Sequence, residues 1–174
     1  MNNRLLLLSG VFLWITCLCN AQETGPVCFE YVNGIQFSSE MAGNQSNTLV
    51  SSFTMAPGIN YSDKLILYVP AKMNIYAVSQ PQPQVSQDIM VGISAAYRRG
   101  SVDIEACHLF GLWYSDLGQM ETGLSLFLNR GKNDRSSFYK IGVSYLTPYQ
   151  KGTKGGLFIS AGLGLRFSLA KCFD

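Results

Sequence analysis

The stretch that decides the fold is GLFISAGLGLRFSL, residues 156–169, close to the end of the chain. Successive side chains of a β-strand point to opposite faces. One face of this stretch would carry bulk at Leu157, Ile159, Ala161, Leu163, Leu165, Phe167 and Leu169, and the other would carry Phe158, Ser160, Gly162, Gly164, Arg166 and Ser168. The pattern predicts a strand, and the fold depends on which of the two faces is turned inward.

The same two-residue period recurs upstream, between turn signals at nearly regular intervals. Eight segments are predicted as strands, at approximately 34–42, 50–61, 65–78, 88–98, 101–114, 119–129, 136–147 and 156–169. Most are longer than ordinary strands and long enough to cross a bilayer when tilted. The sequence therefore predicts an all-β fold, an eight-stranded antiparallel up-and-down transmembrane β-barrel.

The connections between these segments tend to alternate in length. Residues 61–64 and 98–101 are tight polar turns, whereas residues 43–49, 79–87 and 148–155 form longer polar loops. Residues 115–118 are short for the long-loop side, and residues 130–135 are long for the other. An even number of strands places both termini on the short-turn side, which in an outer-membrane barrel faces the periplasm.

The charged residues predict which face is the interior. In a membrane barrel the bulky face meets lipid and the small and charged face fills the lumen. That lumen face would carry Glu40, Lys72, Arg98, Asp103, Glu105, Glu121, Lys140 and Arg166, four acidic and four basic residues. Unpaired charges inside a barrel are costly, so we expect a network of structural ion pairs, drawn from Glu121, Lys140, Arg166 and the pair Asp103/Glu105. Glu121, Lys140 and Arg166 lie on consecutive strands, where inner-face residues can meet.

Glycines and aromatic residues favour the same orientation. The lumen face includes Gly92, Gly111, Gly123, Gly142, Gly162 and Gly164, which would make room for Tyr68, Tyr76, Trp113 and Phe127. A face exposed to water has no steric reason to be rich in glycine. The residues Tyr61, Tyr97, Tyr114, Tyr145 and Phe167 lie near segment ends on the bulky face, where interfacial girdles are expected.

The first residues of the chain have the features of a secretory signal peptide. A short positive region at Asn2–Arg4 precedes an apolar run from Leu5 to Cys19, and Cys19 and Ala21 supply small residues before the cut. The run is shorter than the ~20 residues of a spanning helix. We expect residues 1–21 to be removed, which leaves residues 22–174 as one barrel domain.

The composition of the chain argues against nucleic acid as a partner. The pattern of strands resembles a known family. The net charge is +2 and charged residues make up 14% of the chain, without a basic patch for nucleic acid. With the last strand ending in GLGLRFSL, residues 30–169 resemble the small eight-stranded outer-membrane barrels of OmpA/OmpX type, the "outer membrane protein beta-barrel domain" group. The resemblance implies a Gram-negative cell envelope and outer-membrane lipid as a partner, and it carries no catalytic residue.

No constellation of residues predicts an enzyme, a cofactor or a metal site. His108 is the only histidine, lies on the bulky face and has no adjacent serine. A glycosidase pair of Glu105 and Glu121 would need an open cleft. The function expected is therefore a non-enzymatic barrel, either structural or an accessory subunit of an envelope complex. The alternatives are a lipid-modifying enzyme and a secreted, lipocalin-like ligand-binding barrel.

Three cysteines remain after the cut. Cys28 and Cys172 lie just outside the first and last strands, which pair in a closed barrel, and exported proteins meet an oxidising compartment. A Cys28–Cys172 disulfide would tie the two ends together and leave Cys107 unpaired. Three free thiols are the other outcome that the sequence allows.

Overall fold

The computed structural model describes residues 28–43, 48–61, 64–79, 84–112, 119–130, 135–149 and 155–168. They form nine strands: β1 (Cys28–Ala42), β2 (Thr48–Asn60), β3 (Leu65–Tyr68), β4 (Ala71–Val78), β5 (Gln84–Arg99), β6 (Val102–Leu112), β7 (Gln119–Arg130), β8 (Arg135–Pro148) and β9 (Gly156–Ser168). The expected signal peptide, residues 1–21, lies outside the described residues, and so do Trp113, Tyr114 and Cys172.

The described residues form no apolar helix long enough to cross a membrane.

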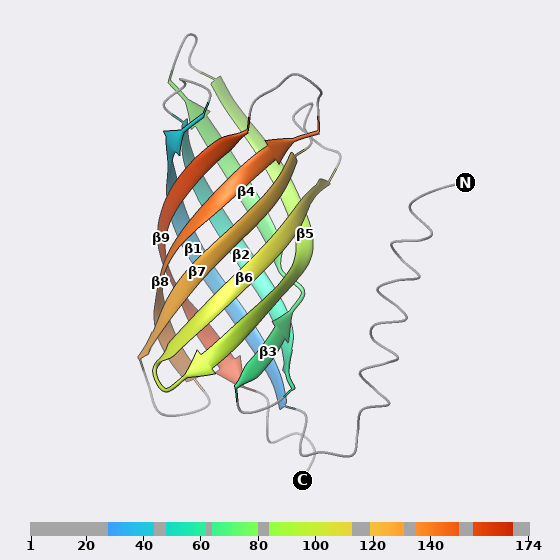
Figure 1. Ribbon diagram of the computed structural model, residues 1–174, viewed down its shortest axis with the longest axis vertical. Coiled ribbons are helices and arrows are strands. Elements are labelled where there is room, and N and C mark those ends of the chain that lie inside the picture. Colours follow the sequence, from blue (N-terminus) through green and yellow to red (C-terminus); the bar gives the residue numbers. More distant parts are fainter. Residues whose placement is uncertain are drawn as a thin grey trace, which may run out of the picture.

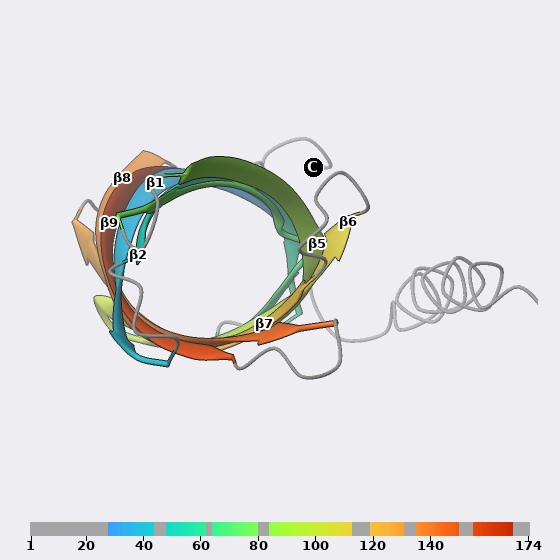
Figure 2. The same ribbon diagram turned by 90° about the horizontal axis from the view of Figure 1, so that it is seen from above.

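The strands close into a barrel, as Figure 2 shows from above. Neighbours along the chain pair in antiparallel fashion, and β1 completes the ring by pairing with both β2 and β9. All eight predicted segments are confirmed as strands. The clearest difference is at β1, which begins at Cys28 rather than at residue 34.

The elements β3 and β4 are two parts of one strand, so the wall of the barrel is made of eight strands. Gly58 of β2 is opposite Tyr68 of β3, and Met55 of β2 is opposite Ala71 of β4. Both elements therefore pair with β2 in one continuous register. The pairing between them continues, because the Val69 N–H donates to the Pro57 carbonyl and the Gly92 N–H donates to the Pro70 carbonyl. Pro57 and Pro70 have no N–H to return these bonds, and this interrupts the regular ladder.

The registers fix the tilt and width of the barrel. Following the partners round the ring from Cys28 returns to Ser38, an offset of ten residues along β1. With eight strands spaced about 4.8 Å apart and rising about 3.3 Å per residue, this offset requires a tilt of about 40° and a backbone radius of about 8 Å. An interior of this width is filled by side chains. The tilted strands are visible in Figure 1.

The bulky face of the strands is on the outside, which answers the question raised by residues 156–169. Leu163 and Leu165 are 53% and 48% exposed, whereas Arg166 is 6% exposed. The same division runs through the other strands. The interior holds two apolar clusters, one of Val32, Ala56, Ile66, Tyr68, Ala96, Phe127 and Phe138, and one of Val50, Tyr76, Met90, Leu109, Leu146 and Phe158.

Inward-facing glycines lie directly against the largest interior rings. A Cβ on Gly58 would overlap the ring of Tyr68, which is opposite it in the neighbouring strand. A Cβ on Gly164 would overlap the ring of Phe138, and one on Gly34 would lie 3.3 Å from the same ring. These glycines therefore make room for aromatic side chains in a narrow interior.

The connections divide the barrel into two rims. The short-turn rim joins β2 to β3, β5 to β6 and β7 to β8, and β5 and β6 are joined by Gly100 and Ser101 alone. The start of β1 and the end of β9 lie on this rim as well. The long-loop rim carries the other connections. The short loop expected at residues 115–118 falls within residues 113–118, which lie outside the described residues.

Candidate functional site: the ion-paired interior of the barrel

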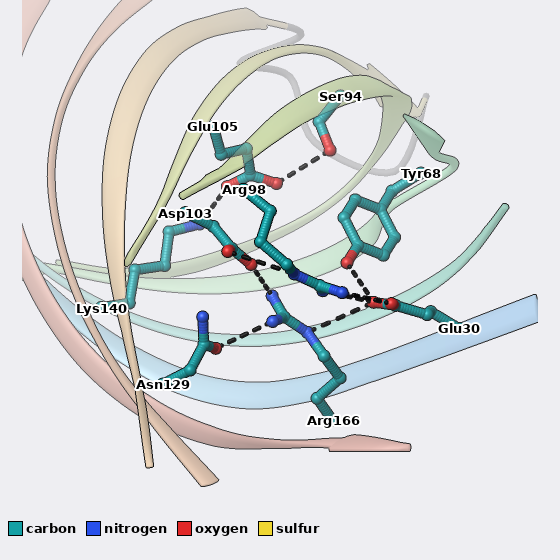
Figure 3. A network of polar contacts seen from close by, with 9 residues as sticks. All are labelled: Glu30, Tyr68, Ser94, Arg98, Asp103, Glu105, Asn129, Lys140 and Arg166. Carbon is teal, nitrogen blue, oxygen red and sulfur yellow. Dashed lines mark hydrogen bonds and ion pairs between the residues drawn. The ribbon is translucent and has the colours of Figure 1, made fainter. Parts of the chain in front are cut away.

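Four charged residues form a ring of alternating sign inside the barrel near the short-turn rim (Figure 3). The Arg98 guanidinium donates two hydrogen bonds of 3.0 Å to the Glu30 carboxylate, and its Nε lies 3.4 Å from Asp103 Oδ1. Arg166 closes the ring, with Nη2 at 2.6 Å from Asp103 Oδ2 and Nε at 3.5 Å from Glu30 Oε2. Each charge in this four-residue ring therefore has two partners of opposite sign.

Neutral side chains add two hydrogen bonds to the ring. The Tyr68 hydroxyl donates to Glu30 Oε2 at 3.0 Å, and Arg166 Nη1 donates to Asn129 Oδ1 at 2.8 Å. Strand pairing explains the reach of Tyr68, because Glu30 and Tyr68 both lie opposite Gly58, which has no side chain. Together with Tyr68 on β3 and Asn129 on β7, the four-residue ring joins β1, β3, β5, β6, β7 and β9.

Two further ion pairs lie deeper in the lumen. Lys140 Nζ is 2.9 Å from Glu105 Oε2, and the Ser94 hydroxyl donates to Glu105 Oε1 at 2.8 Å. Lys72 Nζ donates to both carboxylate oxygens of Glu121, at 2.8 and 2.7 Å. The strands of Lys72 and Glu121, β4 and β7, are not neighbours, so this pair spans the lumen.

The expected contact between Glu121 and Lys140 is replaced by these two pairs. In the register of β7 with β8, Glu121 is opposite Leu146 whereas Lys140 is opposite Phe127. Six residues separate the two positions along β7, which is about 20 Å of strand. This register separates the two positions along the strands, so the direct ion pairs of Glu121 and Lys140 are with Lys72 and Glu105.

The other predicted lumen charges lie as follows. Lys72, Arg98, Asp103, Glu105, Lys140 and Arg166 all belong to the groups described above. Glu40 is half-buried towards the long-loop rim, where the register of β1 with β9 shifts between Glu40 and Ala42. Cys28 begins β1 at the short-turn rim. Its expected partner, Cys172, is outside the described residues.

Sequence reasoning missed two buried acids, Glu30 and Asp88. Glu30 was left out because the strand was started at residue 34, although Glu30, Val32, Gly34 and Gln36 share one face. Asp88 is 2% exposed and is opposite Asn74 across the β4–β5 pair. Among the described residues, no basic side chain forms an ion pair with Asp88.

The interior is almost completely filled in the part of the chain that the structure describes. Two small hollows there, of about 30 and 10 Å³, adjoin Lys72 and Glu121. Each has room for about one water molecule at most. The ion pairs are therefore packed among side chains rather than arranged around an open cleft.

The groups that could perform acid–base chemistry lie on opposite sides of the barrel wall. His108 is on the outer face, with Nδ1 2.8 Å from the Thr122 hydroxyl and its ring edge-on to Phe110. The buried carboxylates are on the inner face, so among the described residues none orients this histidine. Within the same residues, no three His, Cys, Asp or Glu side chains cluster as a metal site would require.

Comparisons with known proteins do not assign the chain to a family. No protein-family model matches the chain, and none of the curated proteins matches it. It is similar to a solved structure described as "De novo design of transmembrane beta-barrels", at 10% identity and a TM-score of 0.46, over 84% of this chain and 98% of that chain. The strand pairing itself defines a closed, eight-stranded antiparallel β-barrel with an ion-paired interior.

Proposed function

We propose that the chain is a non-enzymatic β-barrel of the outer membrane, either a structural barrel or an accessory subunit of an envelope complex. The observation that carries the proposal is the reversed polarity of the wall. Large apolar side chains such as Ile141 and Leu163 are 51% and 53% exposed on the outside, and Asp103 and Glu121 are buried on the inside. A water-soluble barrel has the opposite arrangement.

The height of the apolar wall matches a bilayer. On β9 the outward positions run from Leu157 to Phe167, a span of ten residues with apolar side chains throughout. Ten residues are about 33 Å of strand, or about 25 Å along the barrel axis at a tilt of about 40°. The apolar band of outer-membrane barrels has about this height.

The closed interior favours a structural role over the alternatives. A lipocalin-like barrel holds its ligand in the lumen, and ligand pockets occupy roughly 300–1,000 Å³, whereas the interior hollows here are about 30 and 10 Å³. A lipid hydrolase would need a nucleophile, a histidine and an acid in contact. His108 contacts the Thr122 hydroxyl, but among the described residues no carboxylate contacts this histidine.

Residues 1–21 and the position of the chain ends support the location. The predicted signal peptide directs export, and β1 begins on the same rim where β9 ends. We propose that this short-turn rim faces the periplasm. An accessory role would be recognised by a partner chain that co-purifies in fixed stoichiometry from native membranes in mild detergent.

A depth series of arginine substitutions on β9 tests membrane insertion. Leu163→Arg, near the middle of the band, should lower the free energy of unfolding from lipid vesicles by about 2–4 kcal/mol, and Leu157→Arg, at the rim, by about 0–1 kcal/mol. Both leucines are exposed on the same face, at 53% and 39%. Equal effects at the two depths would contradict a transmembrane barrel.

A further inference from the structure

Charge is unevenly distributed between the two faces of the wall. The acidic residues that the structure describes all occupy inward-facing strand positions: Glu30, Glu40, Asp88, Asp103, Glu105 and Glu121. The exposed basic side chains in the same part of the chain are Lys64, Arg99 and Arg130. Lys64 directly precedes β3, and Arg99 and Arg130 end β5 and β7. All three therefore lie at the short-turn rim, below the apolar band.

A hollow of about 460 Å³ opens at this rim between the start of β3 and the end of β5. It is lined by Lys64, Tyr97, Arg98, Arg99 and Gly100. The backbone holds it together, because the Arg98 N–H donates to the Lys64 carbonyl at 2.7 Å. Gly100 has φ +64°, and nothing lies within 4 Å of where its Cβ would be, so the turn leaves the hollow accessible.

The side chains of the rim hollow have different roles. The Arg98 guanidinium binds Glu30 and Asp103 inside the barrel. Lys64 and Arg99 are exposed, and Tyr97 faces outward at 48% exposure directly above them on the wall. The hollow thus combines two exposed cations with an aromatic ring at the edge of an apolar surface.

We propose that this rim hollow binds the phosphodiester headgroup of an anionic membrane lipid. Guanidinium and ammonium groups form charge-assisted hydrogen bonds to phosphate oxygens, and arginine does so in bidentate geometry. Tyrosine at the interface places its apolar ring towards the acyl chains and its hydroxyl towards the headgroups. A lipid fits better than free phosphate because Leu65 and Tyr97, opposite each other on β3 and β5, continue the apolar wall from the hollow.

The proposal rests on the transmembrane orientation proposed above, so the test begins with insertion. The full mature chain is reconstituted into phosphatidylcholine vesicles, and protection from protease reports insertion. The variant Lys64→Gln/Arg99→Gln removes the two exposed cations. The control variant Lys151→Gln/Lys154→Gln removes the same charge from the segment between β8 and β9, which joins the other rim. All three proteins should insert.

Lipid selection is then measured by native mass spectrometry of protein released from micelles with equimolar phosphatidylglycerol and phosphatidylcholine. The wild type and the control should retain phosphatidylglycerol preferentially. Lys64→Gln/Arg99→Gln should lose about fivefold of this preference for each cation removed, the size expected for a basic residue near an anionic surface.

The outcomes separate the two proposals. Failure of the wild type to insert overturns both. Insertion without preference for phosphatidylglycerol, or an equal loss in the control, overturns the headgroup site alone. Inorganic phosphate is titrated into lipid-free micelles as a separate arm. Saturable binding there that depends on Lys64 and Arg99, without lipid selection, would overturn the assignment to a lipid.

Discussion

At the scale of single residues, the interior charges are stabilised by their number of partners. Glu30, Arg98, Asp103 and Arg166 each contact two residues of opposite charge, at distances from 2.6 to 3.5 Å. Removing one member of a buried pair leaves an uncompensated charge, which costs about 3–5 kcal/mol. The network therefore makes the stability of the barrel sensitive to single substitutions inside it.

The pair that spans the lumen gives the clearest test of this coupling. We expect Lys72→Met and Glu121→Gln each to destabilise the barrel strongly, and the double variant to be destabilised less than the two single variants summed. The interaction energy should be about 1–3 kcal/mol, because Lys72 Nζ donates to both oxygens of Glu121. Urea unfolding in detergent micelles measures it.

The matched control is a second double-mutant cycle, in which Lys140 takes the place of Lys72. Lys140 is paired with Glu105. Lys140→Met with Glu121→Gln should show a smaller interaction energy. A larger coupling of Glu121 to Lys140 than to Lys72 would contradict the observed pairing.

A second prediction at this scale concerns Gly58. A Cβ there would overlap the Tyr68 ring and lie 2.8 Å from the Leu67 carbonyl oxygen, so Gly58→Ala should destabilise the barrel by about 1–3 kcal/mol. Gly100→Asn is the control, because Gly100 is in open space and asparagine tolerates its φ of +64°. If unfolding shows Gly58→Ala to be as mild as Gly100→Asn, Gly58 is not needed as a space for Tyr68.

At the scale of elements, two prolines interrupt the ladder without dividing the strand. Pro57 is at an outward-facing position of β2 and is opposite Val69, whose N–H donates to the Pro57 carbonyl. A valine in place of Pro57 would supply the missing N–H in the same register. We expect Pro57→Val to keep the fold and to add an amide at residue 57 that is protected from hydrogen exchange.

NMR-detected exchange of that amide is the measurement. Protection equal to that of neighbouring Ala56 would agree with one continuous strand from Leu65 to Val78. Exchange at the rate of an exposed loop amide would mean that β3 and β4 are separate strands.

At the scale of the whole molecule, closure of the barrel brings the two ends of the described chain together. Glu30 on β1 is opposite Ser168 on β9, so Cys28 starts its strand beside the point where β9 ends. Cys172 follows Ser168 by four residues, a reach of about 13 Å when extended. The closed topology therefore allows a Cys28–Cys172 disulfide.

Cys107 is excluded from such a bridge by its position. It faces the interior of β6, between Ser94 and Gly123 on the neighbouring strands, and is a free cysteine. Non-reducing peptide mapping should detect either a Cys28–Cys172 peptide or unlinked cysteines. A linked peptide that contains Cys107 would contradict the barrel arrangement. We also expect Cys107 to react with maleimide only after unfolding.

The sequence alone determined the strands and the faces of the wall. Alternation with a period of two is a local property, and in residues 156–169 it separates leucine and isoleucine from glycine, serine and arginine. The sequence pattern did not predict Glu30 as an interior residue, because its neighbours reverse the usual polarity of the two faces. Apolar Val32 points inward and polar Asn33 points outward. Its place inside follows from strand pairing that extends back to Cys28.

Only the tertiary structure decided which charges meet. The balance of acidic and basic residues predicted ion pairs, but the offset of ten residues around the barrel selected the partners. This offset depends on the registers of all the strand pairs together. It joins Lys72 to Glu121 across the lumen and Glu30 on β1 to Arg98 on β5. A register is a property of the closed sheet, and no single strand contains it.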